Sequence, residues 1–195
     1  DPVEQTSRAF HDDPKLGITG GTRFERVSEK GPLKELIVPD DYVCGIDKFY
    51  RKECFKDIGG LIYRAGWDGV DTIKANMKGW RTGQLKNLTI VHLKATGTAK
   101  GEGLKKAGLK YGDISYFMGG YFWHFLLHAL KLTTFNRKPM LGYYMLKGYF
   151  RALLRGERRE SSAFRKALKK RQRKNVSSWT KFLGKKNQGD LGSRG

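Results

Sequence analysis

The first half of the chain alternates apolar strand patterns with helix patterns, and this alternation constrains the fold more than any other feature. Leu88 to Leu93 is β-branched and apolar on both faces, as in a buried strand. A second strand pattern, Leu16 to Phe24, contains glycines that allow a close approach to a neighbouring segment. Helix patterns at residues 3–11, 48–57 and 68–78 separate or flank these strands. Such alternation predicts an α/β layer with parallel strand pairing.

Aspartates mark two of the predicted helix starts. Asp47 is expected to cap the helix at residues 48–57, directly after a short buried strand at residues 42–47. Asp68 is expected to cap the next helix, and its apolar stripe consists of Val70, Ile73 and Met77.

The segment Gly66 to Trp80 contains the residues best suited to chemistry. Asp68 and Asp71 lie three positions apart at the predicted helix start, beside Trp67 and Gly69. A helix N-terminus keeps a carboxylate ionised and fixed in direction, and a general base needs both properties. The Trp67 indole offers a face that stacks on a sugar ring. A helix cap followed by an acidic first turn explains the same aspartates without catalysis, so both interpretations stay open.

Histidines and cysteines give weaker signals. His92 lies at a predicted strand end, where sites of α/β folds form, and a small, basic loop at residues 94–103 follows it. An imidazole there is able to bind a divalent ion or a phosphate oxygen, although a strand-end histidine more often has a structural role. His124 and His128 lack an evident third metal ligand, so they read as polar positions of an aromatic helix. Two reduced, buried or half-buried thiols are expected at Cys44 and Cys54.

Positive charge is concentrated in the last third of the chain. The net charge is +20 over 195 residues, and residues 131–195 contain 19 Lys and Arg against three acidic residues. An aromatic stretch from Tyr111 to Phe150 precedes a basic amphipathic stretch at residues 151–186, an order typical of a membrane-surface anchor. The charge also suits nucleic acid, although no recognised nucleic-acid-binding motif accompanies it.

No segment is a clear membrane-spanning helix. The nearest candidate, Ile114 to Leu132, includes Gly119, Gly120 and Lys131, which favour an interfacial or buried helix. The chain opens at Asp1 with neither a starting Met nor a secretory leader, so we expect a processed chain or a piece of a longer one.

Several of these motifs, in their order along the chain, resemble the C-terminal half of inverting family 2 glycosyltransferases. That family shows an R-x-x-F-x-x-I-G-G-F/L helix, a W-x-G-E-D segment and a strand that ends in His. The similar stretches here are Leu16 to Gly21, Tyr50 to Leu61, Gly66 to Asp71, Lys78 to Trp80 and Leu88 to Thr96, within roughly residues 3–100.

The resemblance implies a partial GT-A (Rossmann-like) layer with defined residue roles. Asp71 matches the family's general base, while Val70 replaces the usual Glu, and Asp68 is the candidate to supply the missing acid function. Residues 67–69 (Trp67, Asp68 and Gly69) would line the acceptor pocket. His92 matches the position that helps to hold a divalent cation, Mg or Mn, or the donor diphosphate.

The expected activity is inverting transfer from a nucleotide-sugar donor to a carbohydrate or lipid-linked acceptor hydroxyl. We expect it in bacterial cell-surface polysaccharide or glycolipid synthesis, at the cytoplasmic face of the cell membrane. The family's N-terminal half, with its Asp-x-Asp metal motif, is missing from this sequence, so the chain alone is expected to be inactive.

The expected organisation is the acceptor half at residues 1–103, a membrane-surface helical region at residues 104–186, which would contact an anionic membrane through residues 131–186, and a disordered tail at residues 187–195. The alternatives are a basic nucleic-acid-binding protein and a non-catalytic interaction domain.

Overall fold

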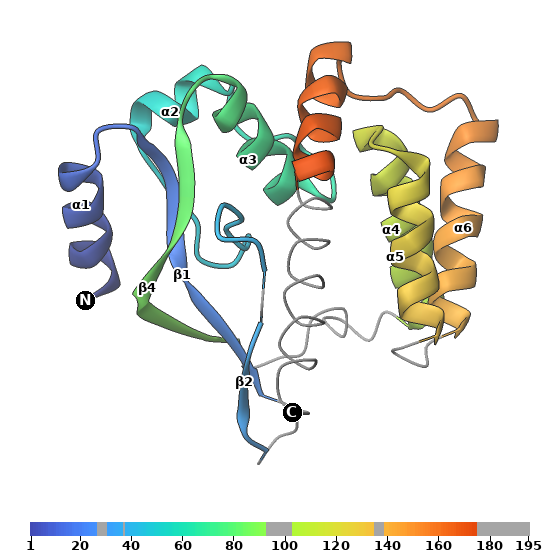
Figure 1. The fold of residues 1–195 in the computed structure, drawn as a ribbon, viewed down its shortest axis with the longest axis horizontal. Helices are drawn as coiled ribbons and strands as arrows, with labels where there is room; N and C mark the ends of the chain where they lie inside the picture. Colours follow the sequence, from blue (N-terminus) through green and yellow to red (C-terminus); the bar gives the residue numbers. More distant parts are fainter. Residues whose placement is uncertain (27–30, 37, 93–102, 135–138, 175–195) are drawn as a thin grey trace, which may run out of the picture.

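The described chain is mixed α/β, with a small four-stranded sheet followed by several helices (Figure 1). A computed structural model describes residues 1–26, 31–36, 38–92, 103–134 and 139–174. The elements in order are α1 (Pro2–Asp12), β1 (Leu16–Arg26), β2 (Leu33–Glu35), β3 (Phe49–Tyr50), α2 (Lys52–Asp57), α3 (Trp67–Met77), β4 (Arg81–His92), α4 (Leu104–Met118), α5 (Phe122–Thr134) and α6 (Pro139–Leu154). A further helix covers residues 162–174.

Strand β1 organises the sheet. β4 pairs with it in parallel, as the alternation of strands and helices predicted. β2 pairs antiparallel with residues 24–26 of β1, and β3 pairs antiparallel with Ile18 and Thr19. The short connection between β1 and β2 excludes the crossover that a parallel pair needs. The described residues therefore show no Rossmann-like parallel sheet, and in this respect the expected GT-A layer is not seen.

The glycines of β1 allow another segment to lie against the strand, as their pattern predicted. A Cβ on Gly20 would lie 2.6 Å from the Asp47 carbonyl oxygen. The Gly21 amide donates to Asp47 Oδ2 at 2.5 Å, between the points where β2 and β3 pair with β1. The predicted strand at residues 42–47 and the predicted Asp47 cap are wrong, because this segment forms turns whose aspartate bonds to β1.

Two helix starts differ from the prediction. α2 begins at Lys52 after Arg51, which makes no side-chain capping bond. α3 begins at Trp67, and its N-cap is Gly66 in the left-handed region with φ 85°, so Asp68 lies in the first turn and is not the cap. Glycine reaches this conformation without the steric clash that a Cβ causes, which explains why it displaces an aspartate here.

Three apolar clusters form the core of the described chain. The first joins the sheet to α2 and α3, the second joins α3 to the helix at residues 162–174, and the third lies among α4, α5 and α6. Their buried members are Ile18, Val43, Cys54, Ile58 and Ala75; Val70, Ile73, Phe164 and Leu168; and Tyr116, Phe125, Ala129, Leu141, Met145, Tyr149 and Ala152. Val70 and Ile73 are buried as predicted, whereas Met77 is exposed.

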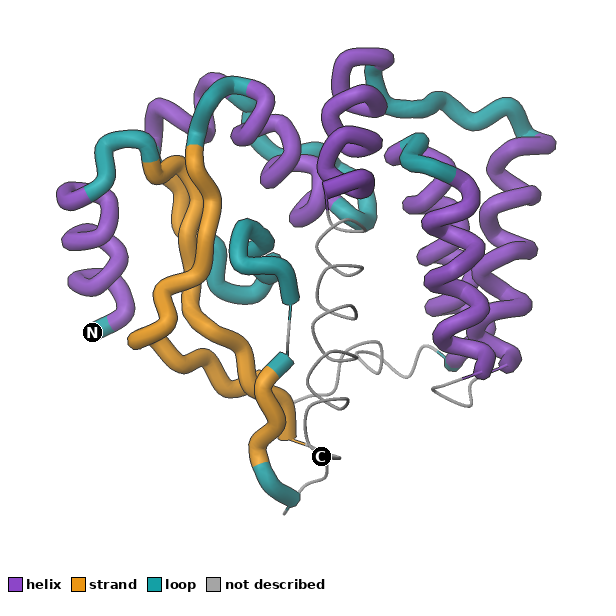
Figure 2. Tube along the Cα trace, viewed as in Figure 1, coloured by secondary structure: helices purple, strands orange, loops and turns teal. Residues whose placement is uncertain are grey.

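The helix at residues 162–174 lies between α3 and the group formed by α4, α5 and α6 (Figure 2). Phe164 and Leu168 pack on α3, and Gln172 Oε1 accepts from the Tyr121 amide at 2.9 Å. The predicted division between residues 103 and 104 falls beside an undescribed stretch and stays a prediction.

Two glycines shape the aromatic helical region: one ends a helix, and the other lets two helices pack closely. The candidate segment 114–132 breaks at Gly119, whose φ of 66° ends α4 before α5 begins. A Cβ on Gly112 would lie 2.0 Å from the Met145 carbonyl oxygen, so the backbones of α4 and α6 touch. Within the described residues, every helix is too short or too polar to cross a membrane.

Candidate functional site

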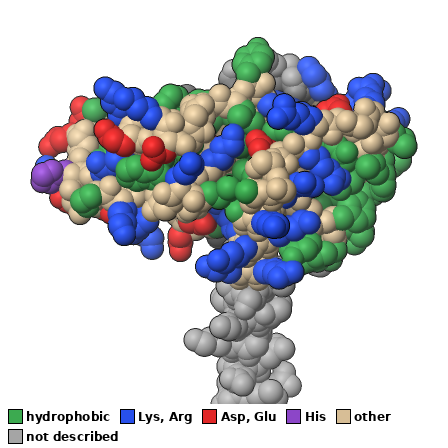
Figure 3. Space-filling model, turned by 90° about the horizontal axis from the view of Figure 1, so that it is seen from above, with side chains coloured by type: hydrophobic (Ala, Val, Ile, Leu, Met, Phe, Trp, Pro, Cys, Tyr) green, Lys and Arg blue, Asp and Glu red, His purple; other side chains and the backbone are tan. Residues whose placement is uncertain are grey.

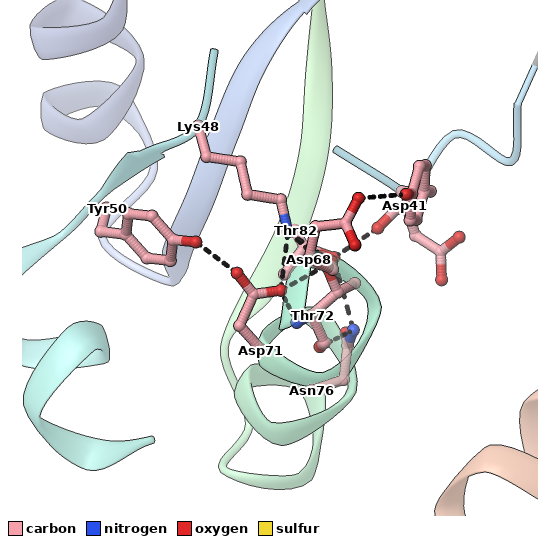
Figure 4. A network of polar contacts seen from close by, with 9 residues as sticks. Asp41, Lys48, Tyr50, Asp68, Asp71, Thr72, Asn76 and Thr82 are labelled. Atoms are coloured by element: carbon pink, nitrogen blue, oxygen red, sulfur yellow. Dashed lines mark hydrogen bonds and ion pairs between the residues drawn. The ribbon is translucent and has the colours of Figure 1, made fainter. Parts of the chain in front are cut away.

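Asp71 forms a buried ion pair with Lys48 at the start of α3 (Figure 4). Lys48 Nζ lies 2.6 Å from Asp71 Oδ1, and both side chains are only 2% exposed. Lys48 belongs to the irregular segment that precedes β3, so the pair joins α3 to the β1 side of the molecule.

The remaining bonding capacity of this pair is also used. The Tyr50 hydroxyl donates to Asp71 Oδ2, and the Thr72 amide donates to Asp71 Oδ1. Lys48 Nζ donates to the Asp68 carbonyl oxygen and, at 3.1 Å, to Thr72 Oγ1. Since both oxygens of Asp71 are bonded and its side chain is buried, Asp71 is a closed carboxylate.

Burial sets the protonation of the neighbouring groups. It lowers the pKa of Lys48 from its usual value, and the charge of Asp71 partly opposes this shift. Burial and the hydrogen bond to Asp71 both raise the pKa of Tyr50. Burial, together with the charge of Asp68, raises the pKa of Tyr42 in the same way. Both tyrosines therefore stay protonated at neutral pH and act as hydrogen-bond donors to the aspartates.

Asp68 is an open carboxylate, in contrast to Asp71. Its side chain is half-buried, and Oδ2 accepts from the Tyr42 hydroxyl at 2.8 Å. Among the described residues, Asp68 Oδ1 has no hydrogen-bond partner. Tyr42 is itself fixed, because its carbonyl oxygen accepts from Gln84 Nε2 on β4 at 2.8 Å.

Trp67 and Gly69 lie beside the two aspartates on the first turn of α3. Trp67 is half-buried, and a Cβ on Gly45 would lie 2.9 Å from its Cζ2 atom. Lys48 Nζ is 5.5 Å from the centroid of the indole ring. Part of the indole therefore contacts the chain itself, and stacking of Trp67 on a sugar stays a prediction.

The structure does not bring His92 to this cluster. His92 pairs with Glu25 on β1, whereas Tyr50 of the cluster pairs with Ile18. Glu25 lies seven positions along the strand from Ile18, a distance of about 23 Å at about 3.3 Å per residue. The side chain of His92 lies outside the described residues, as does most of the predicted loop at residues 94–103.

The described residues do not fit the divalent cation that the resemblance implies. They contain no group of three or more His, Cys, Asp or Glu side chains able to hold a metal ion. At the start of α3, Lys48 and two tyrosines already occupy three of the four aspartate oxygens. Oxygen ligands for Mg²⁺ must be free to coordinate the ion.

The other residues selected from the sequence lie elsewhere. His124 and His128 line a cavity of about 150 Å³ together with Tyr149 and Gln172. Burial lowers the pKa of both imidazoles, which keeps them neutral at pH 7. Cys44 and Cys54 are free and buried, as predicted.

Lys48, Tyr42 and Tyr50 are the site residues that the sequence reasoning missed. The sequence pattern predicted a helix at Lys48 and a strand at Tyr42, and it indicated no role for Tyr50 at the aspartates. The available signal was a lysine and two tyrosines in a mostly apolar stretch that also contains Asp47, since buried polar groups need partners.

Comparisons of the chain with protein-family models, with curated proteins and with solved structures found no match.

Proposed function

We propose that this chain forms the acceptor side of an inverting glycosyltransferase that uses a nucleotide-sugar donor. The observation that carries the proposal is the unequal pair of carboxylates at the start of α3. Asp68 keeps one oxygen available on a turn that the buried Lys48–Asp71 pair holds in place. A carboxylate held in a fixed position with one open oxygen is what a general base requires.

The geometry favours Asp68 over Asp71 as that base. A general base must come within about 2.6–3.2 Å of the proton donor's oxygen. Asp71 is 2% exposed and bonded at both oxygens, so an acceptor hydroxyl would have to displace Lys48 or Tyr50 to reach it. We therefore assign proton removal to Asp68 and the positioning of the turn to Asp71, which departs from the role that the resemblance gave to Asp71.

The proposed reaction is a direct displacement. The acceptor hydroxyl gives its proton to Asp68 Oδ1 while its oxygen bonds to the anomeric carbon of the donor sugar. The bond from that carbon to the nucleoside diphosphate breaks, and the configuration at the carbon inverts. We route no step through a divalent cation, which stays a prediction of the resemblance.

We place this reaction at the cytoplasmic face of a bacterial membrane, with a carbohydrate or lipid-linked acceptor. The composition of the helical region supports this location, since its aromatic and basic residues suit an anionic surface. Nucleic acid is the second candidate partner. Part of the basic helix at residues 162–174 already has partners within the chain, because Arg171 pairs with Asp41 at 2.8 Å and Arg173 lies over Tyr121.

A transfer assay tests the proposal. The protein expressed from its complete reading frame is incubated with a panel of nucleotide-sugars, and release of the nucleoside diphosphate is followed. Asp68→Asn is expected to lower the rate by about 100-fold or more, the usual contribution of a general base. Asp40→Asn, which changes an exposed aspartate nearby, is the matched control and should transfer at the wild-type rate. Absence of transfer from every donor would reject the transferase assignment.

A further inference from the structure

Helix α5 presents an apolar stripe to solvent. Trp123, Leu127 and Leu130 are exposed, with Leu127 at 57%, and they recur at the i, i+4, i+7 spacing of one helix face. The same helix turns Phe125 and Ala129 inward, into the core of the α4–α6 group. α5 is therefore apolar on two faces, and only one of them is needed for the core.

Helix α6 presents a second stripe that adjoins the first. Met140, Tyr143, Phe150 and Leu154 are exposed at the spacing of one helix face, with Leu154 at 86%. The exposed ring of Phe122, at the start of α5, lies with its centroid 6.0 Å from that of Phe150, so Phe122 links the second stripe to α5. We call this surface the α5–α6 face.

The packing of the helices explains why these side chains remain outside. A Cβ on Gly148 of α6 would lie 2.2 Å from the Leu109 carbonyl oxygen of α4, so the interface has no room for larger residues. The helix at residues 162–174 directs Phe164 and Leu168 to α3. Within the described residues, these large apolar side chains of the α5–α6 face therefore remain exposed.

The charge around this face is strongly positive. Residues 104–154 contain eight Lys and Arg and a single acidic residue, Asp113, which pairs with Arg64 at 3.0 Å. Lys110, Lys147 and Arg155 are exposed. Hydrophobic side chains gather on the side of the molecule that carries α4–α6, and Lys and Arg border them (Figure 3).

We propose that the α5–α6 face docks on an anionic lipid bilayer, with its aromatic and aliphatic side chains in the headgroup region and its basic residues on lipid phosphates. Tryptophan and tyrosine favour this interface because their rings are amphipathic, and an apolar face with a cationic border matches an interfacial helix. A protein partner would need a large apolar surface and many negative charges at the same place. An anionic bilayer offers both an apolar interior and negatively charged headgroups.

The sequence predicted a lipid contact through residues 131–186, whereas the proposed contact lies on α5 and α6. The apolar part of the contact comes from α5 and α6, whereas the helix at residues 162–174 uses its apolar side within the protein. The inference goes beyond the proposed function, since it holds whether or not the chain transfers a sugar.

Flotation with phosphatidylglycerol–phosphatidylcholine vesicles tests the docking. Leu127→Glu/Tyr143→Glu places two charges on the α5–α6 face, and both positions are exposed, so the fold is retained. Leu61→Glu/Tyr63→Glu makes the same chemical change at exposed positions of the segment before α3, outside the α5–α6 face. We expect the first variant to bind vesicles at least about tenfold more weakly than wild type, and the control variant to bind nearly as well as wild type.

Each result of the flotation assay decides the matter. Equal weakening in both double variants would show binding by charge alone and would overturn the docking face. The docking face would also be overturned if the wild-type protein bound RNA but not the vesicles. A dimer that the Leu127→Glu/Tyr143→Glu change disrupts would overturn it too. Asp68→Asn should float like wild type, so a failure of the transferase assignment is distinguished from a failure of lipid docking.

Discussion

Replacing Lys48 with methionine is expected to destabilise the fold strongly, because it leaves the Asp71 carboxylate buried without its cation. The pair is 2.6 Å apart and 2% exposed on both sides. Removing one partner of such a buried pair typically lowers the free energy of unfolding by about 3–5 kcal/mol. Asp71 would keep the donors from Tyr50 and the Thr72 amide, so we expect a loss near the lower limit, about 3 kcal/mol.

The matched control is Lys74→Met on α3, the helix that carries Asp71. Lys74 Nζ lies 3.7 Å from Glu160 Oε1, and its side chain is 28% exposed. This pair is longer and, with Lys74 at 28% and Glu160 at 14%, more exposed than the Lys48–Asp71 pair, so its contribution should lie nearer to that of exposed pairs, about 0.2–1 kcal/mol. The same substitution at the two lysines therefore separates the burial of the ion pair from the general effect of losing a positive charge.

Urea unfolding followed by circular dichroism measures both variants and the double variant Lys48→Met/Asp71→Asn. The double variant contains no buried charge at this position, so it should recover about 2 kcal/mol relative to Lys48→Met. A Lys48→Met loss below about 1 kcal/mol, or additive effects in the double variant, would refute the closed ion pair.

Three further predictions concern the two tyrosines of the cluster, the Cys54 thiol and Gly112. Tyr50→Phe should lower the free energy of unfolding by about 2 kcal/mol and Tyr42→Phe by about 1 kcal/mol or less. The reason is that Tyr50 donates to the buried carboxylate of Asp71, whereas Tyr42 donates to the half-buried carboxylate of Asp68. Urea unfolding in which Tyr42→Phe is the more destabilised variant would contradict this prediction. Burial raises the pKa of the Cys54 thiol to about 11, above its unfolded value of 9.0, so the folded state favours the protonated thiol. The contribution of this thiol to the free energy of unfolding is therefore complete below pH 9 and falls as the pH rises to 11. In pH-dependent unfolding, stability should decline less steeply over that interval for Cys54→Ala than for wild type. Gly112→Ala should destabilise the chain by about 1–3 kcal/mol through the 2.0 Å clash with the Met145 carbonyl oxygen, whereas Gly103→Ala, with open space around it, should stay within about 0.5 kcal/mol in thermal unfolding.

The sequence predicted features that depend on local patterns. The helix at α1, the burial of Val70 and Ile73 and the close approach at Gly20 were predicted correctly. Each follows from periodicity or from glycine placed next to apolar residues, and short-range order is sufficient to define it.

The errors concern contacts between distant parts of the chain. Asp47 resembled a helix cap because an aspartate preceded a helical pattern, but its carboxylate bonds to the Gly21 amide, 26 residues earlier. Lys48 and Asp71 are 23 residues apart, and no local pattern indicates that they pair. The difference between Asp68 and Asp71 also arises from tertiary partners, so the sequence, which made Asp68 the cap and Asp71 the candidate base, did not indicate which carboxylate is open.

Sugar transfer by Asp68→Asn and Asp71→Asn, in the protein expressed from its complete reading frame and with circular dichroism of both variants, distinguishes which aspartate removes the proton. If Asp68 is the base, Asp68→Asn keeps its fold and loses about 100-fold or more in rate, whereas Asp71→Asn mainly loses stability. A folded Asp68→Asn that transfers within about twofold of wild type, together with a folded Asp71→Asn that does not transfer, would contradict this assignment of the base.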